Sequence, residues 1–338
     1  MSLNFTPIIP IGSLILVTGV NGLIGSHVAN EALKLGYRVR GVVRSEAKIA
    51  NLKKRWDEAF PGLFEFAIVP DLLANGAYDE AIKGVDAVAH VAAISGDFTT
   101  DLEAATNTVK QIEFRLLEAA AKTPSVKRFV LTSSTVAADG SSPDTPREIG
   151  QDTWNEASKE LAKIESDLQM MMVYSASKTY GEQAAWEWIK EHKPSFEFYT
   201  VNPAFNIGEI LDPSQSGSTA GWFAGAYKGE PFPFITAVPA LNWVSVTDIA
   251  LLHLGAILLP SSTLPPQRLF GAAGSTNINE WLAIFRELEP EKQFLPDFPD
   301  KTEDKAVYDT KGALTVLKAF GQQGFKDLKI AAKENIPK

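Results

Sequence analysis

The sequence of 338 residues predicts an α/β protein built on a doubly wound parallel sheet, with a smaller lobe in its C-terminal part. Two observations predict this fold class. Over the first 200 residues, apolar runs of strand length alternate with amphipathic runs of helix length, as in successive β-α-β units. The run at 14–17 carries no charge on either face, which is typical of strands buried on both sides of a parallel sheet.

The elements expected before residue 203 follow from this alternation. Strands are expected at Leu14–Thr18, Arg38–Val43, Glu65–Val69, Ala87–Val91, Arg128–Thr132 and Glu197–Val201. Helices are expected at Gly22–Leu35, Glu46–Phe60, Tyr78–Ile82, Thr100–Lys122 and Ser175–Lys190. Strands and helices in this order predict right-handed crossovers and a parallel sheet.

The pattern changes after Pro203, where proline, glycine and aromatic residues crowd residues 203–245. A helix is expected at Thr247–Leu259, a short strand at Arg268–Ala272 and a helix at Asn279–Leu288. We therefore predict one domain over residues 1–203 and a second lobe over 204–338, with segments that return to the sheet. Two long irregular stretches, 136–172 and 289–312, are either functional lids or solvated connections.

The composition excludes several classes of function. The formal net charge is −9, and an acidic surface repels phosphate backbones, so we expect no nucleic-acid partner. The absence of cysteine excludes disulfides, thiolate metal sites and a cysteine nucleophile, and no metal site is expected. Residues 1–10 do not resemble a signal peptide, and the longest apolar stretch, 249–259, is about half of a membrane span. We expect a cytoplasmic protein without a membrane partner.

Three glycines lie between the first strand and the first helix. Gly19 suits a tight turn, Gly22 lets the backbone approach a pyrophosphate, and Gly25 lets the helix pack closely on the strand. The free amides at the helix start then face the anion. This predicts a dinucleotide site of the Rossmann type, and the alternative is a glycine-rich corner without a ligand. The neighbouring residues that complete the expected site are Asn21, Leu23 and Ile24.

The end of the second strand predicts which dinucleotide is bound. A site that prefers NAD usually has a carboxylate there, for the ribose 2′-hydroxyl, whereas this strand ends in Arg44. Eight basic residues and one acid lie between Lys34 and Arg55. We expect Arg44 and Lys48, with Arg40 as a further candidate, to hold the 2′-phosphate of NADPH. The alternative is that these are exposed charges without a ligand.

Two further strand ends are expected beside the dinucleotide. Asp71, followed by Leu72, is placed to contact the adenine amino group, although an Asp that only forms a turn explains it equally well. Val91 follows the fourth strand and is expected to pass beside the pyrophosphate. His90 is interpreted as a packed residue at the strand end and not as an acid or base.

Tyr174 and Lys178 are one helical turn apart and therefore share a face. A nearby ammonium favours the phenolate form of a phenol, so such a tyrosine can give a proton to a carbonyl oxygen and recover it afterwards. Ser134 lies at the carboxyl end of the fifth strand and can donate a hydrogen bond to a developing alkoxide. We predict these three residues to be catalytic and Ser133 to line the cofactor. The alternative is a Ser/Thr-rich strand end that satisfies loop amides.

At this point the chain resembles the extended short-chain dehydrogenases/reductases, and most closely the fungal and yeast aldehyde and ketone reductases of the aldehyde reductase II type. Dihydroflavonol reductases are more distant. The resemblance is carried by 18–25, Arg44, Asp71, Ser134, Tyr174, Lys178 and Asn202-Pro203, and segments such as 50–56, 123–129, 216–219 and 251–255 extend it over nearly the whole chain. It implies NADPH as cofactor, reduction of aldehydes and prochiral ketones, and contacts to the cofactor from Pro203, Ser216 and Ser218.

The substrate side is less well defined by the sequence. Apolar residues of the irregular regions are candidates to line a pocket for a small carbonyl compound: Phe98, Phe205, Trp222, Val238 and Leu241. The alternative is that they are ordinary core residues. The chain departs from the family's pattern at 109–114, where a Gly-Thr pair is common, so the pocket wall there is expected to differ. Asn107 is a candidate for the fourth catalytic residue of many short-chain enzymes.

The same residues bear on the other functions of this fold. Dehydratases are expected to carry an Asp-Glu pair after the strand-end Ser/Thr, but here Thr135 is followed by Val136-Ala137-Ala138. Epimerases usually favour NAD, and Arg44 argues against NAD. A non-enzymatic NADPH sensor would be expected to lack Tyr174 or Lys178. The expected assembly is a monomer or a homodimer.

Overall fold

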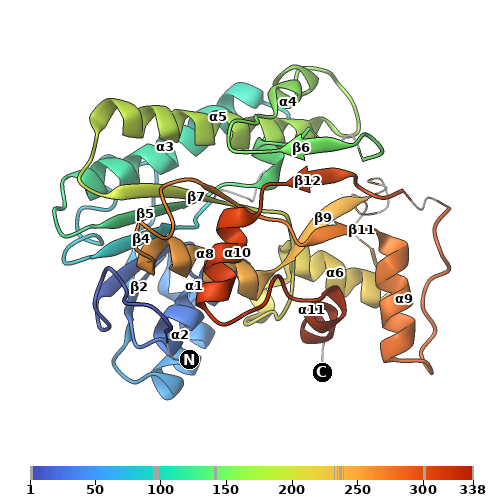
Figure 1. Ribbon diagram of the computed structural model, residues 1–338, viewed down its shortest axis with the longest axis horizontal. Helices are drawn as coiled ribbons and strands as arrows, with labels where there is room; N and C mark the ends of the chain where they lie inside the picture. Colours follow the sequence, from blue (N-terminus) through green and yellow to red (C-terminus); the bar gives the residue numbers. More distant parts are fainter. Residues whose placement is uncertain are drawn as a thin grey trace.

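The predicted doubly wound parallel sheet is present in the structure, a computed structural model (Figure 1) that describes residues 3–93, 99–140, 143–231, 233, 235, 238, 240–299 and 302–336. The main sheet has the order β10-β7-β5-β4-β1-β2-β3, and every pairing in it is parallel. Its strands are β1 (Leu14–Thr18), β2 (Arg38–Val43), β3 (Phe64–Ile68), β4 (Ala87–His90), β5 (Arg128–Thr132), β7 (Glu197–Pro203) and β10 (Arg268–Gly271). The strand order reverses between β1 and β4, which is where ligands bind in open α/β sheets.

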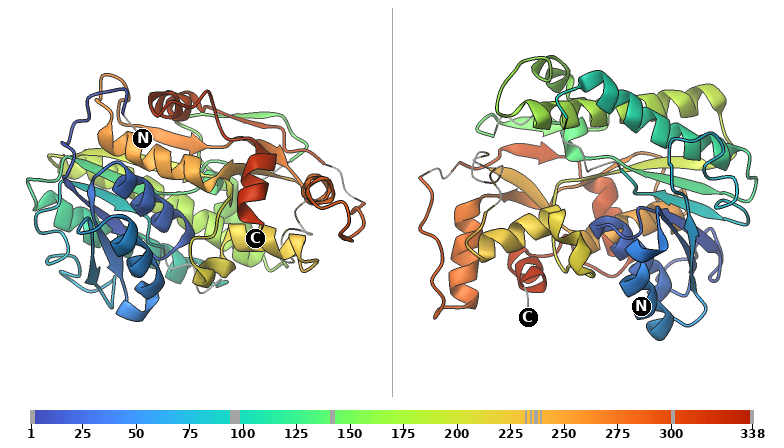
Figure 2. Two further views of the ribbon diagram at one scale, coloured as in Figure 1. Left: turned by 90° about the horizontal axis from the view of Figure 1, so that it is seen from below. Right: turned by 180° about the vertical axis from the view of Figure 1, so that it is seen from behind.

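Helices cover both faces of the sheet (Figures 1 and 2). On one face lie α3 (Leu102–Ala121) and α5 (Gln169–His192), and on the other lie α1 (Leu23–Lys34), α8 (Val246–Leu258) and α10 (Lys311–Ala319). The β1 side chains alternate between two apolar cores: Leu14 and Leu16 belong to one, and Ile15 and Val17 to the other. This two-residue period explains why β1 carries no charge.

Three expected helices differ from the observed elements by more than two residues. The run Tyr78–Ile82 forms turns instead of the expected helix, because glycines with positive φ, Gly76 at 71° and Gly84 at 73°, bracket it. The expected helix 46–60 is divided into η1 (Glu46–Lys48) and α2 (Ala50–Ala59). Helix α5 begins six residues before the expected start at Ser175, so Tyr174 lies inside the helix.

The part of the chain after Pro203 forms a smaller lobe and also completes the main sheet. A three-stranded sheet joins β8 (Phe205–Ile207), β9 (Leu241–Ser245) and β11 (Gly274–Thr276). The lobe also holds η3 (Pro213–Gly217), α6 (Thr219–Tyr227), α9 (Ile278–Leu288) and α11 (Leu328–Asn335). Strand β10 leaves this lobe and pairs with β7 at the edge of the main sheet.

The two irregular stretches are joined to each other. Strand β6 (Arg147–Ile149) pairs in parallel with β12 (Ala306–Tyr308), and a short helix, α4 (Glu156–Leu161), follows β6. The Arg147 guanidinium lies 2.6 Å from Asp139 Oδ2 and 2.8 Å from Asp304 Oδ1, so one cation bridges both stretches. The first stretch begins with η2 (Thr135–Ala137), directly after the predicted catalytic serine.

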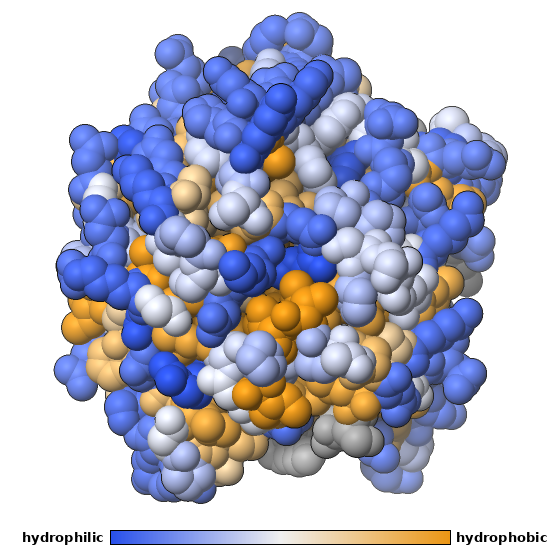
Figure 3. Space-filling view, turned by 60° about the vertical axis from the view of Figure 1, so that its left-hand side comes forward, coloured by the Kyte–Doolittle hydropathy of each residue, from blue (hydrophilic) through white to orange (hydrophobic). Residues whose placement is uncertain are grey.

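Hydrophilic residues cover most of the face in Figure 3, and hydrophobic residues gather in patches near its middle. Isolated apolar residues at a protein surface are normal. Among the residues that the structure describes, no helix has both the length and the apolar character that crossing a membrane requires.

Candidate active site

The glycine turn between β1 and α1 has a shape that only glycine permits. Gly19 has φ +63°, and the Gly22 amide donates to the Gly19 carbonyl at 2.9 Å. A Cβ atom on Gly25 would lie 2.3 Å from the Gly19 carbonyl oxygen, and one on Gly19 would lie 2.9 Å from Ala92 Cα. The backbone is therefore closely packed here, and the unpaired amides of the first turn of α1 are left for an anion.

Gln215 fixes this turn from the C-terminal lobe, and sequence reasoning missed it. Its buried side chain donates from Nε2 to the carbonyls of Asn21 and Gly22, at 3.3 and 3.2 Å, and to Ser26 Oγ at 2.9 Å. Its Oε1 accepts from the amide of Leu211 at 3.1 Å. The η3 segment is thereby held against the predicted pyrophosphate site.

The η3 position bears on two predicted cofactor contacts. Ser218, directly after η3, accepts the Gly221 amide at 3.3 Å and so caps α6, which leaves a cofactor contact by this hydroxyl a prediction. Ser216 lies in η3 itself, but its side chain is outside the described part of the structure. The Asp212-Pro213 pair in the sequence indicates where η3 begins, but nothing in the sequence indicates that η3 packs against the glycine turn.

The end of β4 is tied to the end of β1. Thr18 Oγ1 accepts the amides of Val91 and Ala92, both at 3.0 Å, and lies 2.7 Å from His90 Nδ1. Burial, assisted by the Lys178 charge, lowers the pKa of His90 to about 3, so the ring is neutral at neutral pH. His90 is a packed strand-end residue, as predicted, and Val91 lies beside the glycine turn.

The basic residues of β2 and η1 fall into two groups. Arg44 and Lys48 are exposed beyond the carboxyl end of β2, where the 2′-phosphate is predicted. Arg40 instead hydrogen-bonds Glu65 Oε1 at 2.8 Å and the carbonyls of Ala81 and Lys83 at 2.8 and 2.7 Å. These contacts occupy the Arg40 guanidinium in holding the 78–84 turns, which removes it as a candidate for the phosphate.

Asp71 and Leu72 follow the end of β3 and the extended residues after it. Asp71 Oδ1 accepts the Leu73 amide at 2.9 Å, so this side chain does form a turn, which was one of its two interpretations. Asp71 is exposed and Leu72 is half-buried. A contact of either residue with adenine stays a prediction.

The elements that carry the three predicted catalytic residues meet at the carboxyl end of β5. The buried Lys178 Nζ donates to the Thr132 carbonyl at 3.4 Å, which places the ammonium at the strand end. Tyr174 is half-buried one turn earlier on α5, and α5 packs against η2. Ser134, at the start of η2, donates to the Pro203 carbonyl at 3.4 Å. Helix, strand end and turn therefore converge on one place.

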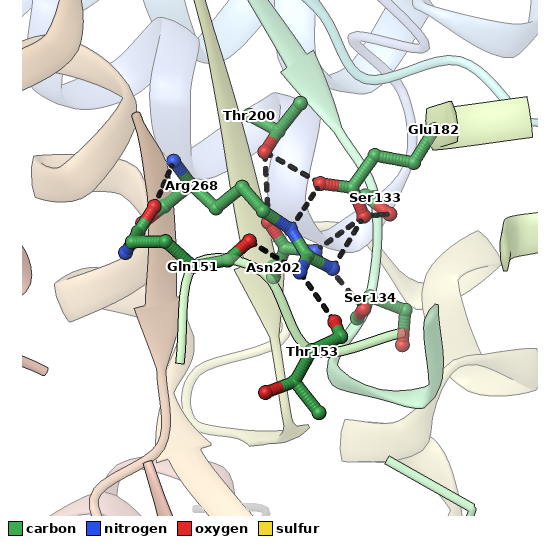
Figure 4. A network of polar contacts seen from close by, with 8 residues as sticks. All are labelled: Ser133, Ser134, Gln151, Thr153, Glu182, Thr200, Asn202 and Arg268. Carbon is green, nitrogen blue, oxygen red and sulfur yellow. Dashed lines mark hydrogen bonds and ion pairs between the residues drawn. The ribbon is translucent and has the colours of Figure 1, made fainter. Parts of the chain in front are cut away.

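Two further candidates lie differently from the expectation. Asn107 is exposed on α3, whereas its neighbour Thr106 is buried. The Ser133 hydroxyl donates to the buried Glu182 carboxylate at 2.7 Å (Figure 4). The hydroxyl of Ser133 is thus used by the fold, and a contact of Ser133 with the cofactor stays a prediction.

Glu113 brings an unexpected acid close to these residues. It is buried where α3 faces α5, and a Cβ atom on Gly181 would lie 3.1 Å from its Oε1. Burial raises the pKa of Glu113 to about 8, Lys178 lowers it and Glu182 raises it. At neutral pH this carboxyl group is therefore mainly protonated, and it adds little negative charge beside Lys178.

We expect Glu113 to make stability depend on pH. The folded-state pKa of about 8 lies above the ordinary 4.5, so the folded protein holds this proton more tightly than the unfolded chain does. The stabilisation is complete below pH 4.5 and is lost as the pH rises through 8. The free energy of unfolding of the wild type, relative to Glu113→Gln, should fall by up to about 1.4 kcal/mol per pH unit in this window.

Urea unfolding at several pH values measures this difference. Glu103→Gln, the same change at an exposed position of α3, is the control and should leave the pH dependence unchanged. Parallel curves for the wild type and Glu113→Gln would contradict the assignment.

The predicted pocket residues lie along the apolar cluster of the C-terminal lobe. Phe205, Trp222 and Leu241 are half-buried against this cluster, with ring centroids of Phe205 and Trp222 6.2 Å apart. Val238 is also half-buried, and Phe98 lies outside the described residues.

Comparison with known proteins gives one family and several close relatives. The model of the NAD dependent epimerase/dehydratase family matches residues 15–269. Aldehyde reductase 2 of Sporidiobolus salmonicolor is 45% identical over 332 residues, covering 97% of this chain and 96% of the relative. Ketoreductase adrE of Penicillium rubens is 36% identical and covers 97% of both chains. NAD-dependent epimerase/dehydratase terH of Aspergillus terreus is 40% identical and covers 96% of both chains.

Solved structures show the same fold. Yeast methylglyoxal/isovaleraldehyde reductase Gre2 complexed with NADPH matches with a TM-score of 0.79 and 24% identity, covering 95% of this chain and 96% of that one. Vestitone reductase from alfalfa matches with a TM-score of 0.74 and 20% identity, covering 95% and 96%. At this identity the likeness concerns the fold, and it agrees with the doubly wound sheet predicted from the sequence.

Proposed function

Because the chain belongs to the NAD dependent epimerase/dehydratase family, we propose that it reduces aldehydes and prochiral ketones to alcohols with NADPH. The observation that carries this proposal is that helix α5, which bears Tyr174 and Lys178, meets the carboxyl end of β5 and η2, where Ser134 lies. The relatives named aldehyde reductase and ketoreductase cover nearly the whole chain, which supports the same reaction.

The residues present fit a dinucleotide. The glycine turn is packed so closely that a Cβ atom on Gly25 would lie 2.3 Å from the Gly19 carbonyl oxygen, and Gln215 fixes the turn by donating to the carbonyls of Asn21 and Gly22. The 2′-phosphate would be held by Arg44 and Lys48. Further residues proposed to hold the cofactor are Asn21, Leu23, Ile24, Asp71, Leu72, Val91, Ser133, Tyr174, Lys178, Pro203, Ser216 and Ser218. When bound, NADPH supplies the hydride that is added to the carbonyl carbon.

The chain's own residues handle the carbonyl oxygen. Tyr174 gives its hydroxyl proton to that oxygen as it becomes an alkoxide, and this kind of general acid contributes about 10²- to 10⁴-fold. Lys178, one helical turn after Tyr174, provides a positive charge at the same end of β5. On substrate binding, Ser134 turns its hydroxyl hydrogen from the Pro203 carbonyl to the same oxygen, where one such donor is worth about 10²- to 10³-fold.

The substrate pocket is proposed on the apolar wall of the C-terminal lobe. Phe205, Trp222, Val238 and Leu241 offer aromatic and aliphatic surface without a charge, so neutral carbonyl compounds are favoured over carboxylates. A monomer or homodimer in the cytoplasm, with no nucleic-acid or membrane partner, stays our prediction.

The proposed function is tested by following NADPH absorbance with a panel of aliphatic aldehydes and aryl ketones. We expect oxidation of NADPH with stoichiometric alcohol formation and a lower rate with NADH. Arg44→Ala should raise the KM for NADPH about 10- to 100-fold and leave that for NADH unchanged, because hydrogen bonds to the charged 2′-phosphate are lost. Arg38→Ala removes an exposed arginine from the other end of β2 and is the control. Absence of turnover on every carbonyl compound, with tight NADPH binding, would overturn the proposal in favour of a sensor.

A further inference from the structure

A fully buried carboxylate lies beside the proposed active site, on the helix that carries Tyr174 and Lys178. Glu182 follows Lys178 by one helical turn and is 1% exposed (Figure 4). Burying a charged carboxylate is unfavourable unless it is paired and hydrogen-bonded. The contacts of Glu182 therefore indicate what it does.

Every contact of Glu182 in the described structure is a donor to the carboxylate. Oε1 accepts from Thr200 Oγ1 and Arg268 Nε, both at 2.8 Å. Oε2 accepts from Ser133 Oγ and Asn202 Nδ2, both at 2.7 Å, and from Arg268 Nη2 at 3.2 Å. Both oxygens at position 182 must therefore accept hydrogen bonds. A glutamine there would place its NH₂ group, which is a donor, against groups that are donors themselves.

Asn202 extends this network to the main chain of the proposed catalytic serine. Its Nδ2 also donates to the Ser134 carbonyl at 3.2 Å, and its Oδ1 accepts from Thr200 Oγ1 at 3.0 Å. Ser133 is bound through its side chain and Ser134 through its carbonyl. Glu182 therefore holds two consecutive residues at the end of β5 against α5.

Arg268, on β10, neutralises the carboxylate and reaches further. Its Nη1 donates to the carbonyls of Gln151 and Thr153, at 3.1 and 2.6 Å, and its guanidinium carbon lies 4.0 Å from the centroid of the Trp154 ring. The network thus joins α5, β5, β7, β10 and the stretch after β6.

We propose that Glu182 is a positioning residue that fixes the β5 end bearing Ser134 relative to the helix bearing Tyr174 and Lys178. This inference rests on the proposed function, because it says that one buried carboxylate maintains the distance between the catalytic residues of that site. Glu182 acts through Ser133 and Asn202 and takes no part in proton transfer. Its loss should impair turnover without weakening the binding of NADPH, because the glycine turn is held separately by Gln215.

The test compares Glu182→Gln with Glu187→Gln, the same change at an exposed position of α5. For Glu182→Gln we expect kcat to fall about 10- to 100-fold, as small misplacements of catalytic groups do, and the NADPH dissociation constant to stay within about twofold. Amide exchange of Thr135 and Val136 should become about tenfold faster, because local opening becomes easier. Glu187→Gln should change none of these quantities.

Two further variants keep the result interpretable. Asn202→Ala cuts the connection to the Ser134 carbonyl and retains the Glu182–Arg268 ion pair, so it should lower kcat in the same way even where Glu182→Gln fails to fold. Val316→Ala weakens the core on the opposite face of the sheet from α5, where α10 packs on α8, and should lower the melting temperature without lowering kcat of the folded enzyme.

The outcomes separate this inference from the proposed function. An unchanged kcat in folded Glu182→Gln and Asn202→Ala, or a loss of NADPH affinity in proportion to kcat, overturns the positioning role. Absence of any carbonyl turnover in the wild type overturns the proposed function, and amide exchange at 135–136 then decides whether Glu182 fixes the strand end.

Discussion

Tyr174→Phe is expected to lower kcat for carbonyl reduction by about 10²- to 10⁴-fold, while the NADPH dissociation constant changes little. The substitution removes only the hydroxyl, so the ring still packs on α5 and the fold is retained. Without that hydroxyl, residue 174 has no proton to give to the carbonyl oxygen. The measurement is single-turnover NADPH oxidation together with fluorescence titration of NADPH.

Tyr180→Phe is the matched control for this prediction. Tyr180 is also half-buried on α5, and the Lys159 ammonium lies 4.3 Å from the centroid of its ring. Losing its hydroxyl should leave kcat within about twofold. If Tyr174→Phe retained turnover comparable to the wild type, the general acid would have to be another group.

Gly25→Ala is expected to weaken NADPH binding by at least about 100-fold. The added methyl would lie 2.3 Å from the Gly19 carbonyl oxygen and 3.1 Å from Val20 Cα, and both of these are backbone atoms that cannot turn aside. The turn must open, and the helix amides then move away from the position where an anion is bound. Fluorescence titration of NADPH measures the loss, and circular dichroism checks that the fold is present.

Gly324→Ala provides the comparison for this change. A Cβ atom on Gly324 would meet nothing within 4 Å, so this variant should bind NADPH as the wild type does. Full NADPH affinity in a folded Gly25→Ala would show that the glycine turn is only a strand-helix corner.

Local signals in the sequence were sufficient for the elements that lie one after another along the chain. The alternation of strands and helices, the glycine turn and the Tyr174–Lys178 spacing each depend on residues close in sequence, and the structure has them as predicted. The prediction of a helix at 78–82 was wrong because it followed the apolar pattern and disregarded Gly76 and Gly84. The positive φ of these two glycines confines the segment to turns.

Contacts between distant residues could not be predicted in this way. Gln215 meets the glycine turn 193 residues away, and Arg268 meets Glu182 86 residues away. A buried glutamine or glutamate has no pattern of its own in a sequence, because its partners are defined only when the sheet is assembled. Arg40 was wrong as a candidate for the 2′-phosphate for the same reason. Its partners, on β3 and in the 81–83 turn, are brought to it only when the strands pack.

The position of β10 has a consequence for how the protein comes to be folded during synthesis. The seventh strand of the main sheet ends at Gly271, and α8, which covers one face of the central strands, ends at Leu258. A nascent chain that has emerged only as far as Pro203 therefore exposes an unpaired sheet edge and an uncovered apolar face, which makes it prone to aggregation. The half of the molecule that would hold the dinucleotide thus depends on later-made residues, and a ribosome must deliver about four fifths of the polypeptide before this sheet can close.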